Sequence, residues 1–70
     1  MARRSHAYRM YLARRSGLFN RLRREARIPD NRAERWIAQW ELEGALRGLD
    51  KHTETFWTPA WEWIADKLRQ

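Results

Sequence analysis

Arginine is the residue type in this chain with the clearest capacity for chemistry. Six arginines lie within residues 14–27, RRSGLFNRLRREAR, around a small apolar set. Guanidinium groups donate forked hydrogen bonds to phosphate and carboxylate oxygens, and several of them on one surface attract a polyanion. The segment therefore predicts contacts to the phosphates of nucleic acid, with DNA favoured over RNA. The candidate binding residues are Arg14, Arg15, Asn20, Arg21, Arg23, Arg24 and Arg27.

A sequence-specific role for the same segment is a second hypothesis. Ala13 and Gly17 have the spacing of the turn in a helix-turn-helix motif, and the helix after Gly17 would then enter the major groove. The candidate base readers in that arrangement are Asn20, Arg21 and Arg24. Arg23 occupies a position that the motif normally fills with a buried aliphatic residue. Contact to phosphates without base reading is therefore the favoured hypothesis.

The charge is divided unevenly along the chain. Residues 1–29 contain nine arginines and one acid, Glu25, which gives +8, whereas residues 30–70 contain six bases and eight acids, which gives −2. All five tryptophans lie in the second part. Seventy residues are enough for one small domain. We therefore expect a single domain over 1–70, with a basic segment at 1–29 and a tryptophan-rich helical hairpin at 30–70.

The arginines must be positioned by helices, because apolar residues recur at spacings of three and four. The first helix is expected over residues 5–27, with Ser5 as its cap and Pro29 as its stop. Arg15 falls in the middle of the apolar stripe of this helix. Either the helix breaks at Ser16–Gly17, or Arg15 extends to solvent or pairs with an acid on another element. A break is favoured because glycine inside a helix costs about 1 kcal/mol.

A second helix is expected over residues 32–47, with Asn31 and Glu34 forming a capping box and Gly48 ending the helix. This helix has two apolar faces. One face holds Ala33, Trp36, Ile37, Trp40 and Gly44, and the other holds Ala38, Leu42, Ala45 and Leu46. A helix that is apolar on two sides is normally covered on both. It should lie between the other two helices, or between one of them and a second copy of the chain in a homodimer.

A third helix is expected to begin near Thr55 or at Thr58–Pro59. The loop before it is short, so the second and third helices should form an antiparallel pair. The fold class predicted for the chain is therefore all-α, a small three-helix domain.

The tryptophans suggest a core and, in one place, a surface. Trp36 and Trp40 are one turn apart, as are Trp57 and Trp61, and these pairs are expected to face each other in the core. Trp63 lies off that stripe beside Phe56, so either these two residues form an exposed protein-binding patch or Trp63 covers the first helix. An alternative function is a phage- or mobile-element-type modulator that docks on a host protein through either the arginines or this patch. The arginines would suit an acidic host protein.

Two stretches carry a family resemblance. AERWIAQWELEGALRGLD and FWTPAWEWIADK together span roughly residues 33–67. They resemble the C-terminal helical pair of short uncharacterised proteins from actinobacteria and their phages. The resemblance implies a compact helical pair and implies no activity or site residue.

Other classes of function find little support in the sequence. We expect no catalytic residues, because no nucleophile motif or glycine-rich phosphate loop occurs. Without cysteine, and with two histidines far apart, no metal site or cofactor is expected. No apolar run reaches the length of a membrane span, and a membrane-surface role ranks behind the others. The expected protein is a cytoplasmic non-enzyme.

Overall fold

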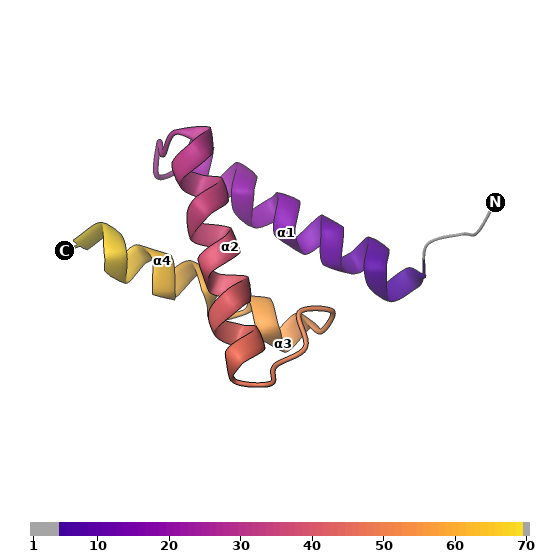
Figure 1. Ribbon diagram of the computed structural model, residues 1–70. Coiled ribbons are helices and arrows are strands. Elements are labelled where there is room, and N and C mark those ends of the chain that lie inside the picture. Colours follow the sequence, from indigo (N-terminus) through magenta and orange to yellow (C-terminus); the bar gives the residue numbers. More distant parts are fainter. Residues whose placement is uncertain (1–4, 70) are drawn as a thin grey trace.

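Four helical segments build residues 5–69, the part of the chain that this computed structural model describes (Figure 1). In chain order they are α1 (His6–Arg24), α2 (Asp30–Leu46), α3 (Glu54–Trp57) and α4 (Ala60–Arg69). These residues contain no strand, which confirms the predicted all-α class. The expected third helix is a bent pair, α3 and α4, joined at Thr58–Pro59. Helices α1 and α2 diverge from the turn that joins them, and α3 lies between them away from that turn (Figure 1).

Helix α1 is continuous through Gly17. It begins as predicted, because the Ser5 hydroxyl accepts a hydrogen bond from the backbone N–H of Tyr8 at 3.1 Å. It ends at Arg24, three residues before the predicted end. The predicted break at Ser16–Gly17 is wrong, because Arg15 is accommodated by pairing with acids of another helix. The helix-turn-helix hypothesis is also wrong, because its turn at residues 13–17 would lie inside the continuous helix α1.

Helix α2 begins at Asp30 and buries only one of its two apolar faces. The predicted capping box is absent: Glu34 binds Arg15 of α1, and the Asn31 side chain accepts from the adjacent Arg32 N–H. The predicted end is confirmed, since Gly48 has a left-handed φ of 74°. The second apolar face is exposed, contrary to the expected burial between two helices of the same chain. Its exposed residues, with Leu49 after the helix, are Ala38, Leu42, Ala45, Leu46 and Leu49.

The core lies where α1, α2 and the α3–α4 segment meet. Its buried residues are Tyr11, Leu22, Ile28, Ala33, Ile37, Phe56, Trp57, Ala60 and Ile64. The tryptophan pairs do not face each other as predicted. Trp40 instead contacts Phe56 and Trp63, with ring centroids 5.8 and 5.3 Å away, while Trp57 contacts Tyr11 at 5.9 Å. The rings therefore join all three helical parts rather than forming one paired stack.

Candidate nucleic-acid interface

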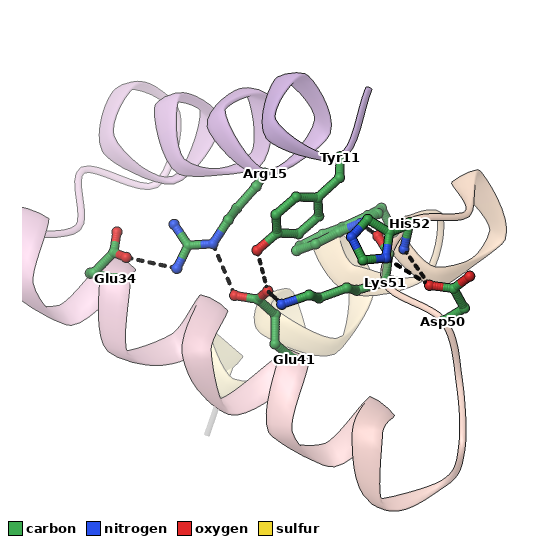
Figure 2. Close-up of polar contacts among 8 residues, drawn as sticks. Tyr11, Arg15, Glu34, Glu41, Asp50, Lys51 and His52 are labelled. Atoms are coloured by element: carbon green, nitrogen blue, oxygen red, sulfur yellow. Dashed lines mark hydrogen bonds and ion pairs between the residues drawn. The ribbon is translucent and has the colours of Figure 1, made fainter. Parts of the chain in front are cut away.

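Arg15 is the residue of the predicted arginine site that points toward α2, and its side chain is partly buried there (Figure 2). Its Nη2 lies 2.7 Å from Oε1 of Glu34, and its Nε lies 2.9 Å from Oε1 of Glu41 (Figure 2). The Arg15 side chain is 23% exposed and the Glu41 side chain 15%. A guanidinium held by two carboxylates has few donors left for a phosphate. Arg15 therefore fastens α1 to α2 instead of contacting a ligand.

Glu41 is the centre of a polar cluster that joins three parts of the chain (Figure 2). The Tyr11 hydroxyl donates to Oε2 of Glu41 at 2.5 Å, and Lys51 Nζ lies 3.7 Å from the same oxygen. Beside the cluster, the Asp50 carboxylate accepts from the backbone N–H of His52 and lies 2.9 Å from the His52 ring nitrogen. Every side-chain polar atom that is buried within residues 5–69 has a hydrogen-bond partner. The cluster thus provides partners for the polar groups that the helices bring inside.

The pKa values of this cluster follow from burial and pairing. Burial raises the pKa of Tyr11 to about 12, and the hydrogen bond to Glu41 acts in the same direction. Burial opposes ionisation of Glu41, but hydrogen bonds from Tyr11 and Arg15, with the positive charges nearby, bring its pKa below the usual value. The hydrogen bond to Glu34 raises the pKa of Arg15, against the effect of burial. Arg15 and Glu41 are therefore both ionised at neutral pH, with Tyr11 as a neutral donor.

The remaining candidate arginines are exposed or line the surface, and they differ in their ion pairs. Arg21 binds Glu25 at 2.6 Å, and Arg23 binds Asp30 at 2.7 Å, but both side chains stay 48% exposed. The other three candidate arginines have no carboxylate partner within the described residues; they are Arg14, Arg24 and Arg27. Asn20 is exposed on α1. Internal pairing thus leaves cationic groups at the surface.

Three of these arginines surround one hollow where α1 turns into α2. We call Arg23, Arg24 and Arg27 the arginine turn; with Ile28, Pro29 and Asp30 they line an open cavity of about 460 Å³. Arg27 has a φ of 54°, a left-handed conformation that is uncommon for a residue with a Cβ. The Ile28 N–H, which follows, donates to the Leu22 carbonyl at 3.1 Å and closes the end of α1. This backbone path puts three guanidinium groups beside the first turn of α2, where helical N–H groups also favour an anion.

The predicted protein-binding pair is not a joint surface. Phe56 is 3% exposed and lies in the core against Gly44, where an added Cβ would overlap its ring. Trp63 is partly exposed, and it covers Trp40 of α2 rather than α1, with Lys67 Nζ 4.4 Å from the centre of its ring. The two aromatic residues therefore do not form the exposed patch that the sequence suggested.

Sequence reasoning missed Tyr11, Glu41 and Lys51 as a cluster and the backbone of Arg27. A signal for the first was present, because an arginine centred on an apolar stripe predicts a carboxylate on the facing helix. Which carboxylate it meets depends on the helix crossing, which local pattern does not specify. The sequence contained no signal for the left-handed turn, because position 27 holds arginine and the usual residue in this conformation is glycine or asparagine.

Within residues 5–69, no helix has the length and apolar character needed to cross a membrane. The same part of the chain contains no group of three or more His, Cys, Asp or Glu side chains arranged to hold a metal ion. No protein family, curated protein or solved structure matches this chain.

Proposed function

We propose that this protein is a non-enzymatic nucleic-acid-binding protein that contacts phosphates through the arginine turn and neighbouring arginines of α1. The observation that carries the proposal is the hollow lined by Arg23, Arg24 and Arg27, of which two have no carboxylate partner within the described chain. Residues 21–30 contain four arginines against Glu25 and Asp30, so the region keeps a net charge of +2 after its own pairing. Clustered guanidinium groups of this kind suit a chain of phosphates.

The pattern of internal pairing supports this proposal. The carboxylates near the turn, Glu25 and Asp30, are each held by one arginine, so they offer little opposition to an approaching polyanion. Arg24 and Arg27 are both exposed; Arg24 is the last residue of α1, and Arg27 lies three residues beyond it. Each contact of this type releases counterions from the nucleic acid, so binding should weaken as salt is added.

Titration of a fluorescein-labelled 20-base-pair duplex by anisotropy, in a salt series, tests the proposal. We expect log affinity to fall linearly with log salt, by about 0.9 in slope for each phosphate contact. The double variant Arg24→Gln/Arg27→Gln should lower the affinity and reduce the slope by about 2. The charge-matched control is Arg9→Gln/Arg69→Gln, which replaces two exposed arginines, one near the start of α1 and one at the end of α4.

Two results would oppose the proposal. Equal losses in the two double variants would show that net charge, and not the arginine turn, governs the interaction. An absence of duplex and single-strand binding at low salt, with a stoichiometric protein complex from nuclease-treated lysate, would favour the modulator of a host protein.

We also propose that the chain pairs with a second copy through the leucine surface, defined as Ala38, Leu42, Ala45, Leu46 and Leu49. Leu42, Leu46 and Leu49 are 60%, 79% and 52% exposed, which is unusual for a contiguous apolar set. In an antiparallel pair of α2 helices centred on Leu42, Arg35 of one copy would approach Asp50 of the other. A hydrogen bond from the backbone N–H of His52 lowers the pKa of Asp50, which keeps that carboxylate ionised.

A further inference from the structure

A second hollow, between α1 and the α3–α4 segment, brings the arginines and the tryptophans of the chain together. It has a volume of about 320 Å³. Its lining includes Arg14, Gly17, Leu18 and Arg21 from α1, with Trp57 and Trp61 from the other side. We call it the Arg–Trp groove. Residues from the basic and the tryptophan-rich halves of the sequence thus line one site.

The Arg21 guanidinium lies over the Trp61 ring in this groove. Its guanidinium carbon lies 3.7 Å from the centre of the Trp61 ring, and its Nε lies 2.6 Å from Oε2 of Glu25. The Arg21 side chain is nevertheless 48% exposed, so part of the guanidinium remains open to a ligand. A guanidinium plane fixed in this way is a surface on which an unpaired base stacks.

Trp57 and Gly17 also shape the groove: the Trp57 ring has a fixed orientation, and Gly17 leaves free space. Trp57 Nε1 donates to the Lys51 carbonyl at 2.7 Å, which sets the orientation of that ring. Gly17 lies on the same side of α1 as Arg14 and Arg21, and a Cβ added there would meet no atom within 4 Å. Glycine inside a helix costs stability. Here it leaves bare backbone, and hence free space, between two arginines.

Arg14 is the group in the groove that can hold an anionic ligand. It is partly buried and has no ion pair within residues 5–69. Arg21 is already paired with Glu25, and Glu54 supplies a carboxylate of the lining. A phosphate in the groove would therefore bind at Arg14. The volume, at the lower limit of typical small-ligand sites, is sufficient for one base with its sugar.

We propose that the Arg–Trp groove holds one unpaired nucleotide of a single strand, with the base stacked on Arg21 and the adjoining phosphate at Arg14. This inference rests on the proposed function and deepens it, because it assigns the protein a preference for single strands. A duplex offers phosphates to the arginine turn but keeps its bases stacked inside. Only a single strand gains the additional contact in the groove.

Anisotropy titrations at one salt concentration test the preference with two labelled probes, a 12-nucleotide thymidine oligomer and a 20-base-pair duplex. The variant is Gly17→Leu, which fills the groove from an exposed position with open space and replaces glycine by a better helix former. Its affinity for the oligomer should fall at least about fivefold, since stacking of one base contributes that much or more. Its affinity for the duplex should stay within twofold. The control is Ser16→Leu, which adds the same side chain at an exposed position outside the groove lining.

A second variant separates stacking from charge. Arg21→Lys keeps the positive charge but loses the planar group, so it should weaken oligomer binding while leaving the salt dependence unchanged. If Gly17→Leu binds the oligomer as tightly as the wild type, the groove assignment is overturned and phosphate binding at the turn still stands. Equal losses for oligomer and duplex also overturn it. Absence of binding to both probes at low salt overturns this inference together with the proposed function.

Discussion

Among single residues, Arg15 shows that position decides what an arginine does. It has the same side chain as Arg24 and lies on the same helix, yet two carboxylates of α2 hold it partly buried against that helix. Arg24 has no such partner within the described residues and stays exposed. A pair of this kind stabilises mainly through the penalty that follows when one partner is removed. Arg15 therefore has a structural role, whereas the Arg24 side chain is accessible at the surface.

Replacement of Glu41 should reveal this penalty. In Glu41→Gln, Arg15 keeps its charge but loses one carboxylate, and Tyr11 loses a charged acceptor. We expect a loss of about 2 kcal/mol in the free energy of unfolding at pH 7, below the value for fully buried pairs because both side chains keep some contact with water. Urea denaturation followed by tryptophan fluorescence measures it. The control Glu43→Gln, whose carboxylate only meets Gln39 at 3.5 Å, should change stability by less than about 0.5 kcal/mol.

The pH dependence of the same comparison has a definite sign. Because the pKa of Glu41 is lowered in the folded chain, its contribution is present above the usual value of 4.5 and is lost as the pH falls through the folded pKa. The stability difference between the wild type and Glu41→Gln should therefore shrink as the pH is lowered below 4.5. A difference that stays constant down to acid unfolding would contradict the assignment of Glu41 as an ionised partner.

Among the helices, α1 and α2 show what local pattern can and cannot predict. The Ser5 cap, the Gly48 stop and an apolar stripe along α1 follow from short-range rules, and they were predicted. The break at Ser16–Gly17 was not formed, because the glycine penalty of about 1 kcal/mol is smaller than the combined gain from packing α1 and pairing Arg15. The capping box failed because Glu34 was taken by a long-range partner, which no local rule includes.

The candidate site was predictable to the same extent. Exposed arginines at positions 24 and 27 follow from their distance from the apolar stripe. Their position around one hollow depends on the left-handed backbone at Arg27, and the contact of Arg21 with Trp61 depends on where the start of α4 lies relative to α1. Both depend on the tertiary arrangement, so the sequence alone does not specify them.

The two helical glycines should respond in opposite ways to the same substitution. In Gly44→Ala the new methyl group would overlap the Phe56 ring, so the helices must separate, at a cost of about 1–3 kcal/mol. In Gly17→Ala the methyl group meets open space, and stability should rise by about 1 kcal/mol. Thermal unfolding followed by circular dichroism compares them. Destabilisation by both substitutions would argue against the open position of Gly17.

At the scale of the whole molecule, the unpaired second face of α2 is the main departure from a self-sufficient small domain. Within residues 5–69, three large side chains are completely buried, Leu22, Ile37 and Ile64, while three leucines of the leucine surface are more than half exposed. Small domains are only marginally stable, so covering such a surface with a second copy would add stability.

Self-association is therefore expected, and it should depend on Leu46. Sedimentation equilibrium in the micromolar range should show a dimer for the wild type and a monomer for Leu46→Glu, because a carboxylate cannot be buried unpaired in an apolar contact. The matched control is Leu68→Glu, which alters an exposed leucine of α4 outside the leucine surface. A wild-type monomer at high micromolar concentration would contradict the proposal.

Because Arg27 has a left-handed conformation, heat resistance and polyanion capture favour different residues at this position. Glycine adopts that geometry without steric cost, so the substitution that most relaxes the backbone there is also one that discharges the rim of the hollow. Laboratory evolution that screened only for heat resistance would accordingly tend to erase the cationic rim, and a selection for survival at high temperature would have to be coupled to a selection for polyanion capture.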